Sequence, residues 1–243
     1  MKHVLITGSS KGIGLAIARK LLSEKFLVTG THHQTPFPED LHRNSAFTGL
    51  KVDLNSQDHT QRELKPLFFN SVPDVLINNA GIFSEADFSL QDDEWLTVWD
   101  RTMNVNLRSA ALLSKWFVNR HFKHGSKGII INIASRAAYR GDTQEFAAYA
   151  ASKAGMTAMT KSIARDFSSK GVVAYTIAPG FIETDMARES IKILGEEALT
   201  KNSAFDEVTQ PEEVAALAAF LCRGEVRHMT GSTFHINGGS YMI

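Results

Sequence analysis

In the segment VLITGSSKGIG, residues 4–14, a continuous apolar and β-branched run ends at a group of glycines. The following LAIARKLLSEK, residues 15–25, has apolar residues at helical spacing, so the order is strand, glycine turn and helix. Glycines in such a turn let the backbone approach a phosphate, and the N–H groups at the helix start attract its charge. Gly8, Gly12 and Gly14 give the spacing G-x-x-x-G-x-G instead of G-x-G-x-x-G, and a purely structural turn is the alternative.

Six more apolar runs with strand character follow, at residues 26–31, 49–54, 74–81, 128–135, 172–180 and 232–238. Helical patterns lie between most of them, and this alternation predicts a parallel sheet with helices on both faces. The connection from Thr31 to Gly49 contains Pro36 and Pro38 and shows little helical periodicity, so we expect no full crossover helix there. No linker, repeat or long charge block divides the chain, which indicates one domain.

The composition excludes several classes of protein. The 243 residues contain 26 Lys and Arg and 26 Asp and Glu, so no net basic charge favours a nucleic-acid partner. With 43% hydrophobic and 21% charged residues, the chain is typical of an ordered globular protein. The single cysteine, Cys222, lies in the apolar helical pattern PEEVAALAAFLC and is expected to be a buried, inert thiol. No apolar stretch is long enough for a membrane span, and Met1 leads into the first strand without a signal-peptide pattern, which favours a cytoplasmic location and no membrane partner.

If the phosphate at the glycine turn belongs to a dinucleotide, the residues at the end of the second strand help to distinguish NAD from NADP. An acidic residue at this position normally accepts a hydrogen bond from the 2′-hydroxyl of NAD. Here the strand ends in Thr31, His32 and His33 without a carboxylate, and Lys11 adds a cation in the glycine turn. NADP(H) is therefore favoured, although His32 and His33 are equally explained as solvated loop imidazoles.

Two further strand ends carry polar residues. Asp53 closes the third predicted strand, where its carboxylate would accept a hydrogen bond from an adenine amino group; a helix N-cap is the alternative. The fourth strand ends in Asn78-Asn79-Ala80-Gly81, whose small residues would let the chain pass close to a ribose. Asparagine there equally fits a role in tying neighbouring strands together.

The catalytic candidates are a tyrosine and a lysine. Tyr149 and Lys153 lie four residues apart in YAASK, so their side chains share one face of a predicted helix. A free phenol has a pKa of about 10, and a nearby ammonium is expected to lower it toward the range of proton transfer. The same pair also occurs by chance on solvated helix faces.

Two more polar residues complete this candidate set. Ser135 closes the fifth strand, where its hydroxyl would hydrogen-bond a substrate carbonyl oxygen. Asn106, in MNVNLRS, is expected to hold a water near Lys153 and so to feed a proton relay. An exposed helical amide is the alternative for Asn106, because Asn104 stands only two residues away.

The motifs TGSSKGIG, Asp53, NNAG, Asn106, Ser135, YAASK and APGFIETDM, in this order over nearly the whole chain, resemble the short-chain dehydrogenase/reductase family. This resemblance implies a single doubly wound Rossmann domain over residues 1–243. Within the family, APGFIETDM and the ending HINGGSYMI look most like 3-oxoacyl-[acyl-carrier-protein] reductases, which use NADPH. The implied reaction is NADPH-dependent reduction of a 3-oxoacyl thioester, carried on an acyl-carrier protein, to the 3-hydroxyacyl thioester.

The resemblance also assigns roles to residues. It makes Tyr149 the general acid, Lys153 a ribose ligand that modulates the Tyr149 pKa, Ser135 the residue that orients the carbonyl, and Asn106 the water holder. The positions it places at the NADP(H) cofactor are Gly8, Ser10, Lys11, Gly12, Ile13, Gly14, His32, Asp53, Leu54, Asn79, Ala80, Gly81, Tyr149, Lys153, Pro179, Gly180, Ile182 and Thr184.

The substrate side departs from the pattern of these reductases. These reductases usually have a Pro-x-Gly-Arg-like stretch before PEEVA, whereas this chain has SAFDEVTQPEEVA, residues 203–215, which overlaps the end of a predicted substrate lid over residues 187–210. An acidic carrier protein needs a basic docking face, which Lys123, Lys127 and Lys170 would supply; solvated lysines are the alternative.

Other functions and the assembly remain as alternatives and expectations. An NADP-dependent enzyme for another ketone, secondary alcohol or sugar would use the same residues, and a non-catalytic cofactor-binding regulator is a different class. Nothing completes a metal site around His121 and His124, so no metal is expected. Apolar residues such as Trp99, Trp116, Met156 and Met159 exceed what one sheet contact would cover, and the family commonly forms tetramers, so we expect a homotetramer; thicker packing inside the monomer is the alternative.

Overall fold

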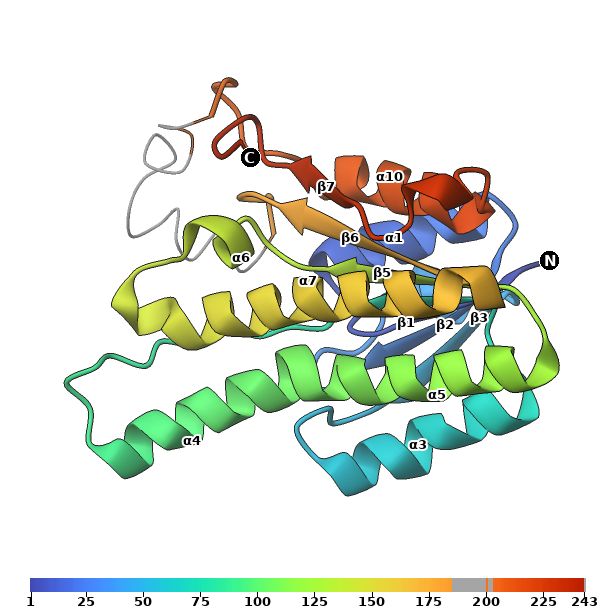
Figure 1. Ribbon diagram of the computed structural model, residues 1–243, viewed down its shortest axis with the longest axis horizontal. Coiled ribbons are helices and arrows are strands. Elements are labelled where there is room, and N and C mark those ends of the chain that lie inside the picture. The colour runs from blue at the N-terminus through green and yellow to red at the C-terminus, as the bar shows by residue number, and fades with distance from the viewer. Residues whose placement is uncertain (185–199, 201–202, 243) are drawn as a thin grey trace.

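The computed structural model describes residues 1–184, 200 and 203–242 (Figure 1). All seven strands belong to one parallel sheet with the order β3-β2-β1-β4-β5-β6-β7. This confirms the predicted seven-stranded, doubly wound α/β fold. The strands are β1 His3–Ile6, β2 Leu27–His32, β3 Phe47–Lys51, β4 Val75–Asn78, β5 Gly128–Ile133, β6 Val172–Pro179 and β7 Thr233–Ile236.

The helices cover both faces of the sheet (Figure 1). They are α1 Gly12–Ser23, α2 Glu39–His42, α3 Gln57–Asn70, α4 Asp92–Met103, α5 Ser109–His124, α6 Ala137–Arg140, α7 Ala147–Phe167 and α10 Pro211–Arg223. Short 3-10 turns lie at Gln144–Phe146, Ser168–Lys170 and Arg227–Met229. Between β2 and β3 the described helix, α2, is a single turn, which confirms that no full crossover helix forms there.

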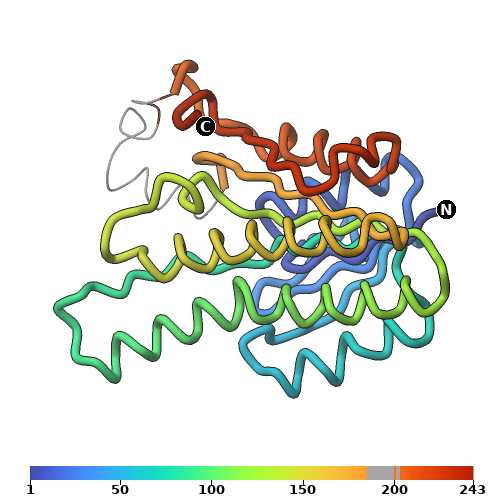
Figure 2. Tube along the Cα trace, viewed as in Figure 1, coloured from blue at the N-terminus to red at the C-terminus, as the bar shows by residue number. Residues whose placement is uncertain are grey.

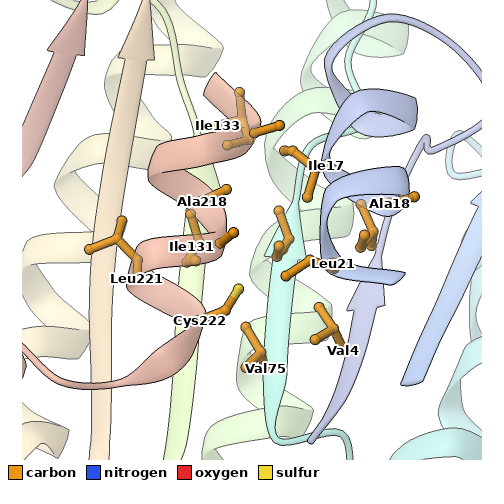
Figure 3. Packing of buried hydrophobic residues seen from close by; sticks show 14 of the residues in the cluster. Val4, Ile17, Ala18, Leu21, Val75, Ile131, Ile133, Ala218, Leu221 and Cys222 are labelled. Carbon is orange, nitrogen blue, oxygen red and sulfur yellow. The ribbon is translucent and has the colours of Figure 1, made fainter. Parts of the chain in front are cut away.

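Successive residues of each central strand point to opposite faces, and both faces are buried. Val4 packs with α1 and α10 in one cluster, in which Ile17, Leu21 and Leu221 are also buried (Figure 3). Leu5, the next residue, packs in the cluster beneath α3, α5 and α7. Burial on both sides explains why the strands are continuous apolar runs in the sequence.

Cys222 belongs to the first of these clusters and is fully buried (Figure 3). Burial raises the pKa of its thiol to about 12, so the reactive thiolate is not populated at neutral pH. The prediction of an inert structural thiol is confirmed.

Helices α4 and α5 are joined without a break by a π-helical turn at Asn104–Arg108. Figure 2 shows them as one continuous helical path that bends between the two helices. The sequence predicted one helix here and gave no sign of the turn. The structure places Trp116 and Met156 in the interior of the single chain, at 8% and 0% exposure. For these two residues the alternative of thicker packing inside the monomer is therefore correct, whereas Trp99 and Met159 are only partly buried. No helix in the described part of the chain has the length and hydropathy needed to cross a bilayer.

Candidate active site

The predicted site residues gather at the edge of the sheet where the parallel strands end. Ser135 follows β5, Asn79 follows β4 and Gly180 follows β6, while α1 and α7 begin at this same edge (Figure 1). The strand order reverses between β1 and β4, which are neighbours in the sheet. Ligands of open α/β sheets bind outside the carboxyl ends of the strands at such a reversal.

Lys153 occupies the interior of this region, with 3% of its surface exposed. Its Nζ donates a hydrogen bond to the backbone carbonyl of Ile133 at 2.8 Å and lies 5.7 Å from the centroid of the Tyr149 ring. Burial lowers the pKa of the Lys153 ammonium to about 8. The spacing of four residues on α7 thus places both side chains on one face, as predicted, where Lys153 is buried and Tyr149 is partly buried.

The pKa of the Tyr149 phenol depends mainly on burial of the ring. Burial raises the pKa of its phenol, and interaction with the Ser135 hydroxyl opposes this increase. Desolvation of the phenolate is the largest contribution to this shift, and the expectation that Lys153 lowers the Tyr149 pKa stays a prediction. A phenol with a raised pKa stays protonated at neutral pH and is ready to donate its proton.

Asn106 lies in the π-helical turn and is completely buried, so the alternative of an exposed amide is wrong. Its Oδ1 accepts a hydrogen bond from the Ile82 N–H at 2.8 Å, and its Nδ2 donates to the Ile82 carbonyl at 3.0 Å and to the Ser152 hydroxyl at 3.1 Å. The amide therefore fastens the chain after β4 to α7, beside Lys153. π-Helical turns are frequent at functional sites, and this one places Asn106 inward.

Tyr139, the other tyrosine near Ser135 in the sequence, contacts β7 instead. Its hydroxyl is 2.6 Å from the Thr233 hydroxyl, and its ring packs edge-on against His235. Tyr139 therefore contacts β7, whereas Tyr149 is the tyrosine that lies beside Lys153.

The glycine turn fits a bound phosphate group. Lys11 caps α1 without a side-chain hydrogen bond, and the first turn of the helix has no acidic residue, so its N–H groups keep their positive potential. Gly12 has a φ of +55°, and a Cβ there would meet Thr184 at 3.2 Å. A Cβ on Gly14 would lie 2.2 Å from the Gly8 carbonyl. Only glycine therefore allows this path of the chain, which leaves the backbone bare for a dinucleotide pyrophosphate.

Gly8 connects this turn to the end of β4. Its φ is +67°, and a Cβ there would lie 2.9 Å from the Ala80 Cα. Asn79 Nδ2 donates to the carbonyls of Thr7 and Gly8, at 3.0 and 2.8 Å. Asn78 likewise links β4 to Asn132 on β5 at 2.7 Å. The alternative that these asparagines tie neighbouring strands together is confirmed.

Comparisons with known proteins agree with this geometry. A family profile described as Enoyl-(Acyl carrier protein) reductase matches residues 8–241. The 3-oxoacyl-[acyl-carrier-protein] reductase FabG of Vibrio cholerae is 37% identical over 251 residues, which cover 100% of this chain and 98% of that protein. FabG of Pseudomonas aeruginosa is 35% identical over 248 residues, which cover 99% and 98%. The chain belongs to the short-chain dehydrogenase/reductase family.

Solved structures of dehydrogenases share the fold of this short-chain dehydrogenase/reductase. A 4-hydroxyisoleucine dehydrogenase complexed with NADH has a TM-score of 0.89 at 28% identity and covers 98% of each chain. A protein described as an NAD(P)-dependent gluconate 5-dehydrogenase from Beutenbergia cavernae, with bound NADP, has a TM-score of 0.90 at 26% identity and covers 98% of this chain and 96% of its own.

The residues predicted at the adenine end of this short-chain dehydrogenase/reductase have mixed placements. Asp53 lies two residues beyond β3, and its Oδ1 accepts a hydrogen bond from the Asn55 N–H at 2.9 Å. The N-cap of α3 is Ser56, whose hydroxyl accepts from His59 N–H, so the alternative N-cap role of Asp53 is wrong. Leu54 is 7% exposed and packs in the core, which leaves only its backbone for a ligand.

Basic groups gather where β2 and β3 end. His32 and Lys51 are register partners on these neighbouring strands, and Lys51 is exposed. Burial lowers the pKa of His32, and the nearby charge of Lys51 lowers it further. The sequence analysis missed Lys51, whose position beside His32 depends on strand register. His33 Nε2 lies 4.0 Å from the Asp53 carboxylate.

The remaining predicted cofactor positions lie around the end of β6. Pro179 accepts a hydrogen bond from the Arg136 N–H at 2.9 Å, and Gly180 N–H donates to Ile236 at 2.8 Å. Ile182 is buried and pairs in a β-bridge with Thr209. Of the predicted lid, 187–210, the segments 187–199 and 201–202 lie outside the described residues. At the turn itself, Ser10 is buried, Ile13 and Gly81 are partly buried, and Lys11 is exposed.

Aromatic residues beside Tyr149 were also missed. Phe83 stacks on Phe146 with 3.8 Å between ring centroids, and its ring lies edge-on to Tyr149 at 4.8 Å. A phenylalanine that follows NNAG gives no distinctive signal in the sequence, because the stack joins segments far apart in the chain. This stack limits the movement of the Tyr149 ring.

Lys123, Lys127 and Lys170 lie near the starts of β5 and β6, at the edge of the sheet opposite Ser135. Lys170 also pairs with Asp166 at 3.2 Å. Within a single chain, the predicted docking face therefore does not adjoin the site. In the described part of the chain, no group of three or more His, Cys, Asp or Glu side chains is arranged to hold a metal ion.

Proposed function

We propose that this chain is an NADPH-dependent reductase of 3-oxoacyl thioesters, which forms the 3-hydroxyacyl thioester. The similarity to proteins named 3-oxoacyl-[acyl-carrier-protein] reductase over the full chain supports the substrate class. The observation that carries the chemistry is the buried Lys153 ammonium, 5.7 Å from the centroid of the Tyr149 ring, because it can stabilise the phenolate that remains after Tyr149 gives its proton to the ketone oxygen.

In this proposal the bound cofactor supplies a hydride to the ketone carbon. The Ser135 hydroxyl donates a hydrogen bond to the ketone oxygen and orients it, and Tyr149 transfers its proton to that oxygen as the negative charge develops. The Lys153 ammonium, held by the Ile133 carbonyl, stabilises the resulting phenolate. Asn106 fixes the Ile82 segment and Ser152 around this lysine, and its predicted role as a water holder stays a prediction.

The preference for NADP(H) is supported by charge. His32 and Lys51 adjoin at the ends of β2 and β3, and Lys11 stands exposed in the glycine turn. The Lys11 and Lys51 ammonium groups match the charge of the extra 2′-phosphate of NADP, whereas a carboxylate at this position would favour NAD. The lowered pKa of His32 makes its imidazole neutral at pH 7, so it can contribute a hydrogen bond but no charge. We infer that Lys51 adds to the contacts predicted for Lys11 and His32.

A carrier-protein partner fits best with an oligomer. Helix α7 extends from the site end, near Tyr149, to Lys170 just beyond its other end, about 30 Å away at 1.5 Å per residue. If two copies pair α7 antiparallel about a two-fold axis, the lysines of one copy lie beside the site of the other. Exposed Leu96 and the stacked pair Trp95 and Trp99 on α4 support association, and we expect a homotetramer. One domain over residues 1–243, a lid at 187–210 and a cytoplasmic location stay predictions.

The test is a comparison of NADPH oxidation with an acetoacetyl thioester, on a carrier protein or a pantetheine mimic, against simple ketones and sugars. A kcat/KM at least tenfold higher for the thioester is expected. The second candidate, a dehydrogenase of another hydroxy compound, is favoured by the structural similarity to 4-hydroxyisoleucine and gluconate dehydrogenases, and a sugar acid as the best substrate would establish it. Cofactor binding without turnover of any ketone would indicate a non-catalytic regulator.

A further inference from the structure

A second buried cation stands next to the catalytic serine. Among the described residues, Lys153 and Arg136 are the lysine and arginine side chains that are buried, and Arg136 is 8% exposed. Arg136 follows Ser135 directly, and its N–H donates to the Pro179 carbonyl, which fixes its backbone between the ends of β5 and β6. The proposed reaction gives this arginine no role.

The guanidinium of Arg136 has few partners. One of its nitrogens donates to the Ser240 hydroxyl, and its carbon lies 4.5 Å from the centroid of the Phe181 ring. No carboxylate oxygen of the described residues lies within 4.0 Å of it. The charge of Asp142 acts on Arg136, but the Asp142 carboxylate pairs with Arg140 at 3.8 Å. A guanidinium has five N–H donors, so most of its hydrogen-bonding capacity remains for a ligand.

The side chain faces a cavity that adjoins the cofactor positions. Arg136 lines this cavity together with Phe181, Glu207, Thr209, Asn237 and Ser240, and no ion pair joins Glu207 to Arg136. Phe181 stands between Gly180 and Ile182, which are predicted to flank the nicotinamide. The cavity is therefore a continuation of the site beyond Ser135.

A buried charge without a counter-ion costs a fold several kcal/mol, and Arg remains protonated even though burial lowers its pKa. Proteins keep an energetically unfavourable group of this kind at functional sites, where a bound ligand supplies the opposite charge. The planar fork of a guanidinium matches a carboxylate in two parallel hydrogen bonds, and the Thr209 hydroxyl and the Phe181 ring suit an anion on a short carbon chain. The Ser240 hydroxyl donates its proton to the Asn237 carbonyl and is not a donor to this anion.

We propose that Arg136 binds a carboxylate of the substrate, so that the ketone reduced at Tyr149 carries a carboxylate at its far end. This proposal rests on the proposed reductase function and narrows its substrate class. Adjacent Cα atoms are about 3.8 Å apart, so the carboxylate lies within the length of a short acyl chain from the ketone held by Ser135.

The test uses two thioesters of the same mimic that differ only at the far end, the 3-oxohexanoyl thioester and the monothioester of 3-oxohexanedioic acid. We expect the wild-type kcat/KM to be at least tenfold higher for the carboxylate form. In Arg136→Met, the ratio of the two values should fall to about one, and Arg136→Lys should restore part of it. A second pair, 4-oxopentanoate and its methyl ester, shows whether a free keto acid is recognised in the same way.

Arg140→Met is the matched control, because Arg140 is a nearby arginine whose partner is Asp142, and it should keep the wild-type ratio. Ser240→Ala removes the described hydrogen-bond partner of Arg136 without removing the charge, and it should keep most of the preference.

Equal wild-type kcat/KM for both members of each pair would overturn the proposal, even if Arg136→Met does not fold. If Ser240→Ala lost the preference for the carboxylate thioester as fully as Arg136→Met, the role of Arg136 would be to hold the C-terminal segment in place and not to bind the substrate. Failure of the whole reductase function is distinct, because then neither thioester would support NADPH oxidation that depends on Tyr149.

Discussion

Replacing Lys153 with Met should make the protein more stable and much less active. Lys153 is 3% exposed, and burial lowers the pKa of its ammonium from 10.5 to about 8. At about 1.4 kcal/mol per pKa unit, this shift means that the buried charge costs about 3 kcal/mol at pH 7. Met has a similar length and no charge, and the lost hydrogen bond to the Ile133 carbonyl costs about 1 kcal/mol. We therefore expect the free energy of unfolding to increase by about 2 kcal/mol, while kcat falls by about 10²-fold or more.

The sign of the pH dependence follows from the lowered pKa. Between pH 8 and 10.5 the unfolded chain binds the Lys153 proton and the folded chain releases it. The contribution of Lys153 to the free energy of unfolding of the wild type therefore increases with pH across this range. Below pH 8 the full cost of burying the charged ammonium is present. The advantage of Lys153→Met should be largest at pH 7 and should vanish at about pH 10, where the remaining charge penalty equals the roughly 1 kcal/mol of the lost hydrogen bond.

The assay is urea denaturation without added cofactor, at one protein concentration and at several pH values between 7 and 10, followed by circular dichroism. Lys161→Met is the matched control, because Lys161 is an exposed lysine on the same helix, and its variant should stay within about 0.5 kcal/mol of the wild type. A Lys153→Met variant that is less stable than the wild type at pH 7, or a stability difference that does not change with pH, would refute the reasoning. In that case the ammonium would be compensated in the folded protein.

Three further predictions concern catalysis, cofactor and assembly. Tyr149→Phe removes only the acidic hydroxyl, so NADPH binding measured by fluorescence should persist while turnover falls by on the order of 10² or more; Tyr139→Phe is the control, and loss of turnover in that variant alone would contradict the assignment. NADPH should give a higher kcat/KM than NADH, and His32→Asp should shift the preference toward NADH, as should Lys51→Glu; equal values for both cofactors in the wild type would contradict the charge argument. Light scattering should show a tetramer whose activity falls on dilution, and a fully active monomer of 26.8 kDa would exclude this.

Much of the fold was predictable because it depends on local patterns. The glycine turn after VLIT, the apolar runs and the helical periodicity between them determined a parallel α/β sheet, since strands buried on both faces need continuous apolar sequence. The short connection between β2 and β3 followed from Pro36 and Pro38. The π-helical turn at Asn104–Arg108 was not predictable, because one extra residue in a helical turn leaves the apolar pattern almost unchanged.

The sequence placed Tyr149 and Lys153 on one face of a helix, because residues four apart on a helix share a face whatever surrounds them, and the roles of Ser135, Tyr149 and Lys153 stay predictions from the family resemblance. The sequence did not determine their environment. Burial raises the Tyr149 pKa and lowers that of Lys153, and both shifts depend on how far the sheet and α4 to α7 exclude water. Likewise, the pairing of Lys51 with His32 depends on strand register, and the position of the Arg136 guanidinium beside Ser240 depends on segments distant in sequence. Tertiary structure alone decides these features, because desolvation and charge pairing depend on distances in space that sequence separation does not give.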